Sequence, residues 1–256
     1  MNIQVIMSDN RDVEFDLEKC EYNTLSAIIN YEYCYKHKYN FKYFQPLINS
    51  EAKLANCLSP NIKPRHAAWS KILSCIKVIE EDCKYDFVVY LDSDCVFNHH
   101  ETSLINYLNQ AKNILDQNVD IEHDIFFMNN QPWCRNLPCS GFFIFRPSIR
   151  SHEFFKQWYR QEQEEKFNLH HPWEQYCLHT HLIKEWSFEI IDDWMFQDRK
   201  QNQYLRHIGQ FDILRKTFFH EAISRYSQQK IESHIDYINS SIIRYETSDI
   251  KYGILS

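Results

Sequence analysis

The stretch YDFVVYLDSDCVF, residues 85–97, decides the fold class. Within it, Phe87–Leu91 is an uninterrupted run of apolar and β-favouring residues, which is typical of a central strand covered on both faces. The run ends directly in Asp92, Ser93 and Asp94. Ligands of open α/β sheets bind at the carboxyl ends of the strands. The sequence therefore places two carboxylates at the edge where such a sheet binds its ligand.

The segments on both sides of this strand alternate between strand and helix patterns. Apolar residues at helical spacing predict a helix over 24–38, and Pro64 suits the first turn of the next one. We expect strands over 3–7, 41–44, 87–91, 124–128, 142–145 and 188–191, and further helices over 103–116, from about 151, over 172–183 and past 211. This alternation predicts an α/β fold, with a central, mostly parallel sheet flanked by helices.

Composition and charge narrow the class of protein. With 44% hydrophobic and 25% charged residues, the 256-residue chain has the composition of a folded globular protein. No apolar run approaches the ~20 residues that cross a membrane, and the opening MNIQVIMSDN lacks the features of a secretory signal. We therefore expect no transmembrane segment and a cytoplasmic location. A net charge of −7 argues against nucleic acid as a partner.

The glycine and cysteine counts exclude further chemistries. The chain holds three glycines, Gly141, Gly209 and Gly253, where about 18 would be usual for its length. Neither GxGxxG nor GxxxxGK[ST] can be formed, which excludes dinucleotide oxidoreductases with that fingerprint and P-loop NTPases. The nine cysteines include no CxxC pair, so we expect most of them to be buried thiols.

Asp92 and Asp94 have the spacing of a site for a hard cation. Residues two apart on a strand face the same side, so both carboxylates would point to one place while Ser93 points away. One or two carboxylates together with substrate phosphates usually hold Mg²⁺ or Mn²⁺. The alternative is an acidic turn that only closes the strand.

Several other segments carry a family resemblance when they are taken in chain order with 85–97. Residues 24–44, TLSAIINYEYCYKHKYNFKYF, contain an Asn, then a Tyr, then a hydrophobic helix and a His-x-Tyr sequence, with Lys38 where glycine is usual. Residues 137–148 (LPCSGFFIFRPS), 171–178 (HPWEQYCL) and 204–212 (YLRHIGQFD) follow. Together these segments resemble the GT-A-type nucleotide-sugar glycosyltransferases, in particular the galactosyl/xylosyltransferase family that includes galactomannan galactosyltransferases. The resemblance covers about residues 1–216, and Glu174 stands where that family has aspartate.

The resemblance implies a fold and an activity. The fold would be GT-A-type and Rossmann-like, in a single domain over 1–256 with a nucleotide-binding half (about 1–100), an acceptor-side half (about 101–216) and a helical tail (about 217–256). The enzyme would be a metal-dependent glycosyltransferase that moves a hexosyl or pentosyl unit. The donor would be a nucleotide-diphosphate sugar, with UDP-sugars favoured, and the acceptor a hydroxyl of a glycan or another molecule. The resembled family retains the anomeric configuration.

Site residues carry over from the resemblance one by one. Asp94 would be the main ligand of Mn²⁺ (or Mg²⁺), Asp92 would act beside it, and His207 would complete the metal shell. Residues expected around the nucleotide are Asp92, Ser93, Asp94, Lys71, Gly141 and Gly209. Glu174 and Gln175 are expected beside the transferred sugar. Lys71 and Arg146 are candidate cations for the leaving diphosphate.

Other interpretations of the same residues remain open at this stage. His207 is equally an ordinary satisfied histidine, and Glu174 an acid that complements a helix dipole. Trp133 and Trp173 suit either sugar stacking or the core. The sequence DSDCV also fits the haloacid dehalogenase-like phosphohydrolases, with Asp92 as nucleophile, Asp94 as acid/base and the pair Asp192–Asp193 as distal Mg²⁺ ligands; in an inverting transferase that pair would instead supply the base. A non-catalytic carbohydrate- or nucleotide-binding module is a third class.

Overall fold

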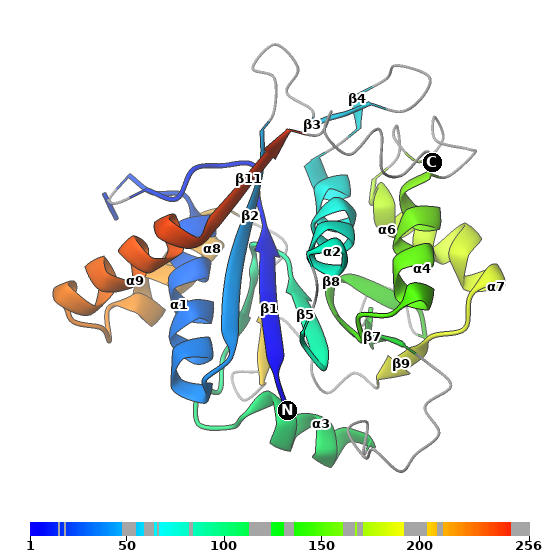
Figure 1. The fold of residues 1–256 in the computed structure, drawn as a ribbon. Helices are drawn as coiled ribbons and strands as arrows, with labels where there is room; N and C mark the ends of the chain where they lie inside the picture. The colour runs from blue at the N-terminus through cyan, green and yellow to red at the C-terminus, as the bar shows by residue number, and fades with distance from the viewer. Residues whose placement is uncertain are drawn as a thin grey trace.

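The structure is a computed structural model that describes residues 1–14, 16–17, 19–47, 55–58, 64–65, 67–81, 84–112, 124–130, 136–160, 167, 171–191, 204–208 and 212–246. A seven-stranded sheet in the order β11-β2-β1-β5-β8-β7-β9 forms its centre (Figure 1). The strands are β1 (Ile3–Ser8), β2 (Asn40–Leu47), β5 (Phe87–Leu91), β7 (Ile125–Asn129), β8 (Pro138–Phe145), β9 (Glu189–Ile191) and β11 (Ile242–Glu246).

Strand directions confirm the predicted, mostly parallel sheet. β11, β2, β1 and β5 run parallel to one another, and β9 runs parallel to β7. β8 alone lies antiparallel to both of its neighbours, β5 and β7. Every residue of β1 and of β5 is buried, as the unbroken apolar run of β5 predicts for a strand with a layer on each face.

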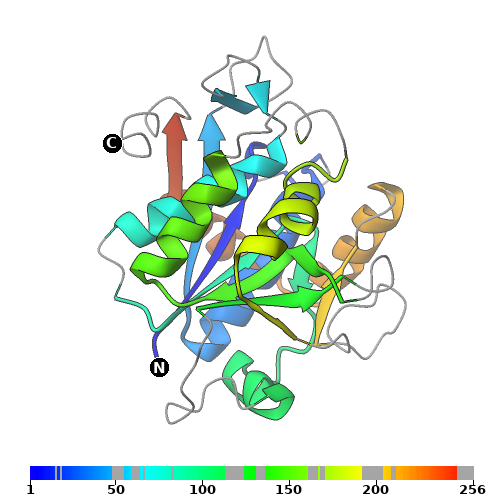
Figure 2. The ribbon, with the colours of Figure 1, turned by 90° about the vertical axis from the view of Figure 1, so that its right-hand side faces the viewer.

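Helices cover both faces of the sheet (Figures 1 and 2). Successive residues of a strand point to opposite faces, so Val5 packs in one core cluster and Ile6 in the other. The first face is covered by α1 (Tyr22–His37), α8 (Asp212–Ile223) and α9 (Gln228–Ser241), and the second by α2 (Ser70–Glu80) and α4 (Ile149–Arg160). The layered α/β fold predicted from the alternating pattern is therefore confirmed.

Smaller elements complete the described residues. Two short two-stranded sheets pair β6 (Cys95–Phe97) with β10 (Leu205–His207) and β3 (Ala55–Leu58) with β4 (Pro64–Arg65). The remaining helical elements are η1 (Ala67–Trp69), α3 (Leu104–Lys112), α6 (Glu174–Cys177), the π-helical turn η2 (Leu178–Leu182) and α7 (Ile183–Glu185).

The residue that ends α1 is a lysine where the resembled family has glycine. Lys38 follows the helix with φ 57° and ψ 37°, in the left-handed region, and its N–H caps the carbonyls of Cys34 and Tyr35. Glycine is the usual residue at this position because it has no Cβ to clash. Lys38 therefore keeps the capping geometry at a conformational cost.

Three predicted elements differ from the structure. Pro64 lies in the short strand β4, and the helix it was expected to open begins at Ser70, after η1. The helix expected from Pro172 begins at Glu174 and changes to π-helical geometry at Leu178. The tail expected to be helical from 217 continues after α9 into β11, a strand on the edge of the main sheet.

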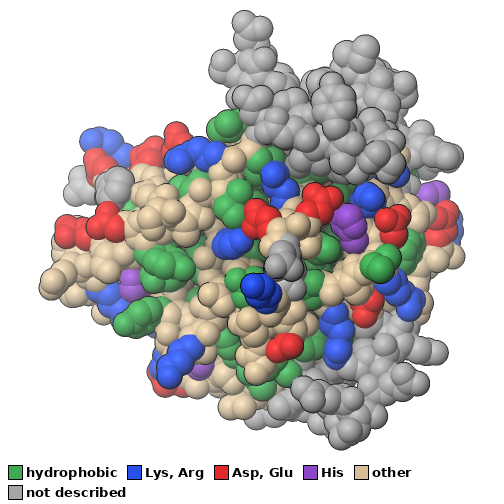
Figure 3. Space-filling view, in the orientation of Figure 1, with side chains coloured by type: hydrophobic (Ala, Val, Ile, Leu, Met, Phe, Trp, Pro, Cys, Tyr) green, Lys and Arg blue, Asp and Glu red, His purple; other side chains and the backbone are tan. Residues whose placement is uncertain are grey.

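The structure tests the predictions made from composition about cysteines, membrane spans and surface charge. Six cysteines are free and buried, as expected: Cys20, Cys34, Cys75, Cys95, Cys139 and Cys177. Within the part of the chain that is described, no helix combines the length and the apolar character of a membrane span. On the face drawn in Figure 3, basic side chains are interspersed with acidic ones.

Candidate functional site

The two aspartates lie in a turn at the carboxyl end of β5. The backbone N–H of Asp92 donates to the carbonyl of Gly141 on β8 at 2.8 Å, and the N–H of Cys95 donates back to the carbonyl of Asp92 at 2.9 Å. The sequence predicts that strand alternation aims both carboxylates at one place. Both aspartates line the same pocket, but they have different partners: Asp92 contacts Lys71 and Asp94 contacts His207.

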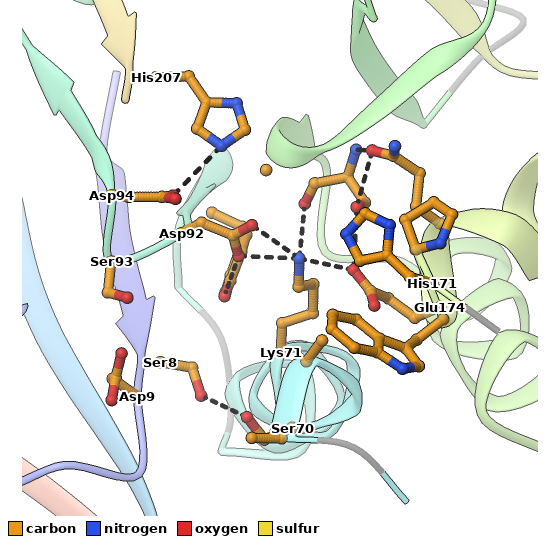
Figure 4. A pocket seen from close by; sticks show the side chains of 18 of the residues that line it. Ser8, Asp9, Ser70, Lys71, Asp92, Ser93, Asp94, His171, Glu174 and His207 are labelled. Carbon is orange, nitrogen blue, oxygen red and sulfur yellow. Dashed lines mark hydrogen bonds and ion pairs between the residues drawn. The ribbon is translucent and has the colours of Figure 1, made fainter. Parts of the chain in front are cut away.

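Asp92 binds a buried lysine. Lys71, on α2, is 3% exposed, and its Nζ lies 2.8 Å from Asp92 Oδ1 and 2.8 Å from Glu174 Oε1 (Figure 4). Lys71 Nζ also donates to the carbonyl of Ser140 at 3.2 Å, and the Tyr90 hydroxyl donates to Asp92 Oδ1 at 2.9 Å. Burial opposes the ammonium charge, but the two carboxylates outweigh it and raise the pKa of Lys71. The Lys71 ammonium therefore lies between two acidic side chains, Asp92 and Glu174.

Glu174 is buried with one oxygen engaged and one free of protein partners. Its Oε1 accepts from Lys71 and from the Ser140 hydroxyl at 3.0 Å, while Oε2 has no hydrogen-bond partner among the described residues. The neighbouring Gln175 accepts through Oε1 from the Ser140 N–H at 2.9 Å. Burial raises the pKa of Glu174 despite the opposing effect of Lys71. The two residues predicted to lie beside the transferred sugar therefore lie side by side against β8.

Strand pairing brings His207 to Asp94. In the β6–β10 ladder His207 pairs with Cys95, and the Ile208 N–H donates to the carbonyl of Asp94 at 2.9 Å. As a result, His207 Nε2 lies 3.2 Å from Asp94 Oδ1. Burial opposes the imidazolium, but Asp94 outweighs it and raises the pKa of His207 well above its ordinary value. Arg215, on α8, approaches the other oxygen of Asp94 at 3.5 Å.

Gly141 occupies the narrow space between these groups. A Cβ at this position would lie 3.1 Å from His207 Cε1 and 3.2 Å from Asp92 Oδ2, closer than side chains normally tolerate. The glycine is needed for this close approach, since its φ lies outside the left-handed region. Asp92 and His207 therefore converge on one point of β8, even though Asp92 lies outside the tighter group of Asp94, Cys95 and His207.

Two arginines that the sequence reasoning missed form another wall. Arg11 binds the Asp9 carboxylate with two hydrogen bonds of 2.8 and 2.6 Å, and it reaches Ser93 Oγ at 3.3 Å. The guanidinium groups of Arg11 and Arg215 both lie over the ring of Tyr22, 4.1 and 4.9 Å from its centroid. One signal was available: Asp9 directly follows β1, at the same edge of the sheet as Asp92. Nothing in the local sequence marks Arg11 or Arg215.

These side chains line one pocket of about 1180 Å³. It runs from Asp9, Arg11 and Tyr22 past the Asp92–Asp94 turn to the segment 171–176. Trp173 also lines it, with φ 45° and its ring centroid 4.8 Å from that of His171. The volume is slightly above the roughly 300–1,000 Å³ of typical small-molecule and cofactor sites.

The structure places most of the predicted site residues in this pocket. They are Lys71, Asp92, Ser93, Asp94, Gly141, Glu174, Gln175 and His207. Arg146 is not among its lining residues: β8 runs antiparallel to β5, so the residue after β8 lies at the opposite edge of the sheet, with its guanidinium over Phe87. Gly209, Trp133 and the pair Asp192–Asp193 lie outside the described residues, as do most of the loops 130–138 and 195–206 that were expected to close over the donor.

The donor atoms at Asp94 and His207 fit a divalent metal. Carboxylate and imidazole are both ligands of Mn²⁺. Gly141 leaves the approach to them free of a side chain, and the Asp94 carboxylate lies 3.2 Å from His207 Nε2. Asp92 is turned toward Lys71, so it would act beside such an ion rather than as its main ligand.

Comparison with known proteins supports the class that the fold suggests. The structure matches the crystal structure of a glycosyltransferase involved in the glycosylation of the major capsid of PBCV-1, with a TM-score of 0.63 and 14% sequence identity, over 86% of this chain and 100% of that chain. The fold is therefore that of a Rossmann-like glycosyltransferase. No curated protein sequence matches the chain.

The family follows from the sequence itself. The chain belongs to the nucleotide-diphospho-sugar transferase family, whose model matches residues 31–225. The predicted glycosyltransferase activity is confirmed at this level, and the phosphohydrolase alternative is not supported. The narrower resemblance to the galactosyl/xylosyltransferases stays a prediction.

Proposed function

We propose that this protein transfers a hexosyl or pentosyl unit from a UDP-sugar to a hydroxyl of a glycan acceptor, with a divalent metal and with retention of the anomeric configuration. The observation that carries the proposal is the pocket in which the Asp92–Asp94 turn, His207, Lys71 and Glu174 meet at the carboxyl edge of the sheet. Membership of the nucleotide-diphospho-sugar transferase family supports the donor class. Retention and the preference for UDP rest on the resemblance described above.

Asp94 and His207 are the residues that would hold Mn²⁺ or Mg²⁺. When bound, the ion would neutralise charge that develops on the leaving nucleoside diphosphate. Arg11 and Arg215 add two guanidinium groups on the same side of the pocket, near Asp9 and Asp94. The two-pronged face of Arg11 is taken by Asp9, so this wall would favour the diphosphate mainly through its positive charge.

Glu174 and Gln175 stand on the other side of Lys71, where the sugar would lie. The free Oε2 of Glu174 is a buried acceptor that a sugar hydroxyl can satisfy. Lys71 keeps this carboxylate and Asp92 in fixed positions, so the donor end and the sugar end of the pocket share one cation. Ser140 fixes both Glu174 and Gln175 from β8.

A donor panel tests the proposal. Purified protein is incubated with UDP-, GDP- and CMP-linked sugars, with Mn²⁺ or with a chelator, and release of free sugar or transfer to glycan acceptors is followed. We expect turnover of one or more UDP-sugars that requires the metal and is lost in Asp94→Asn. Asp236→Asn, on the exposed face of α9, is the matched control and should keep full activity.

The product's anomeric signal in nuclear magnetic resonance reports the stereochemistry. The α or β configuration of the donor should be kept in the product. Turnover that is unaffected by the chelator would refute the metal, and an inverted product would refute retention. Binding of sugar nucleotides without any turnover would favour the non-catalytic module.

A further inference from the structure

A cysteine thiol lies among the side chains where Asp94 meets His207. Cys95 is the first residue of β6 and pairs with His207 across the β6–β10 ladder. One ligand atom from each of Asp94, Cys95 and His207 lies within 4.8 Å of the other two. The Cys95 side chain is buried. The turn and the ladder therefore bring an oxygen, a sulfur and a nitrogen donor together.

A second thiol lies next to the same imidazole. Cys139 on β8 is buried and interacts with His207. Gly141, two residues further along β8, leaves the space beside the ring open. The histidine thus lies between a carboxylate and sulfur atoms, an environment richer in soft donors than a site for Mg²⁺ or Mn²⁺ needs.

The chemistry of these donors selects among divalent metals. Mg²⁺ and Mn²⁺ prefer carboxylate, carbonyl and water oxygens, whereas thiolate and imidazole ligands favour Zn²⁺. Zn²⁺ takes cysteine, histidine and aspartate in a tetrahedral arrangement, and three protein ligands leave one position open. Affinity for a given site also rises from Mn²⁺ through Co²⁺ to Zn²⁺. A cluster of Asp, Cys and His should therefore bind Zn²⁺ more tightly than Mn²⁺.

We propose that Asp94, Cys95 and His207 form a binding site for Zn²⁺ and similar borderline-soft divalent cations. Binding displaces the thiol proton of Cys95 and the imidazolium proton of His207 to solvent, since both ligands coordinate in their deprotonated forms. Because the site shares Asp94 and His207 with the proposed Mn²⁺ position, Zn²⁺ acts as an inhibitor that competes with Mn²⁺. This inhibition rests on the proposed function, whereas the Zn²⁺ site itself does not.

Cobalt titration of the full chain tests the site directly. Co²⁺ replaces Zn²⁺ in such centres, and a cobalt–thiolate bond gives a charge-transfer absorption band in the near ultraviolet. We expect the wild-type protein to develop this band with one equivalent of Co²⁺ and to lose it when Zn²⁺ is added. Saturation with Co²⁺ without the band would overturn the proposal, whatever the variants do.

Single-cysteine variants assign the sulfur ligand. Cys95→Ser should abolish the band and weaken Zn²⁺ binding about tenfold or more. Cys34→Ser, a buried cysteine of α1, is the matched control and should keep both. A band that survives in folded Cys95→Ser protein, as checked by circular dichroism, would overturn the assignment of Cys95.

The same measurements separate this proposal from the proposed function. The cobalt band needs neither donor nor acceptor, so it persists even if no sugar nucleotide is turned over. Mn²⁺-dependent turnover without the band would leave the transferase standing and refute the Zn²⁺ site. If both are present, Zn²⁺ should inhibit turnover in wild type, and higher Mn²⁺ should relieve the inhibition. Inhibition that Mn²⁺ does not relieve would refute the shared position.

Discussion

Replacing Lys71 with methionine should destabilise the protein in a strongly pH-dependent way. Lys71 is the cation between Asp92 and Glu174, at 2.8 Å from an oxygen of each. The methionine keeps most of the buried stem but removes the charge. Asp92 is 26% exposed and keeps the hydrogen bond from Tyr90, so it can be hydrated, whereas Glu174 is 4% exposed. The cost of the change therefore falls mainly on Glu174.

The size of the effect follows from the protonation of Glu174. A buried carboxylate without its cation takes up a proton, which costs about 1.4 kcal/mol for each pH unit above its unfolded pKa. With an ordinary value of 4.5 for Glu174, the loss is about 3 kcal/mol at pH 7 and less than about 1 kcal/mol at pH 5. The sign is that of a group whose pKa is raised in the folded state: stability falls as pH rises. Breaking buried ion pairs costs a similar ~3–5 kcal/mol in general.

Urea denaturation of wild type and variant at pH 5 and pH 7 measures both numbers. Lys77→Met, on the same helix but with its ammonium over the Tyr245 ring, is the matched control and should lose less than about 1 kcal/mol at either pH. The double variant Lys71→Met/Glu174→Gln should regain most of the loss at pH 7. An equal loss at both pH values, or no recovery in the double variant, would refute the assignment of Glu174 as the dependent charge.

Three further changes have defined outcomes. Gly141→Ala puts a Cβ 3.1 Å from His207 Cε1. Because small displacements of site groups are costly, the affinity for Mn²⁺ and for the nucleotide should fall about tenfold in calorimetric titration, with little change in melting temperature. Unchanged affinity would contradict the argument that Gly141 is needed for the close approach of His207. Asp94→Asn removes the ion pair that contributes most to raising the pKa of His207, so this pKa should fall, as followed by the imidazole proton shifts. In wild type the pair's contribution to stability is complete below the unfolded pKa and is lost as pH rises through the raised one. Lys38→Gly relieves the left-handed backbone at φ 57° and should stabilise the protein by about 0.5 kcal/mol in urea; a loss of stability would show that the lysine side chain contributes more than its backbone costs.

The strand that carries the site, β5, could be predicted because the sequence pattern that identifies it is local. Five consecutive apolar residues can be satisfied only by cover on both faces, and Phe87–Leu91 is indeed buried throughout. The carboxylates that follow such a strand must lie at its carboxyl edge. Gly141 was informative for a similar reason, because glycine is rare in this chain and a Cβ does not fit at this position.

The remaining features depend on contacts that the local sequence does not encode. Arg11 and Arg215 both contact Tyr22 although they lie far apart in the chain. The periodicity of the sequence predicts helices and strands but not such long-range contacts. Because β8 runs antiparallel to β5, Gly141 lies in the site and Arg146 does not. A run of apolar residues predicts a strand but does not predict the direction of that strand in the sheet. The sequence IIRYE at Ile242–Glu246 contains β-favouring residues, but its place in the main sheet depends on the edge that β2 offers.

That edge strand ties the order of chain synthesis to the completion of the site. β11 lies beside β2, and its Tyr245 hydroxyl donates to the carbonyl of Ser70 at 3.1 Å, directly before Lys71 in α2. A growing chain that has not yet released residues 242–246 from the ribosome therefore presents β2 as a bare sheet edge and leaves the start of α2 without this anchor. During synthesis, the lysine between the two acids therefore gains this support only after residues 242–246 have emerged.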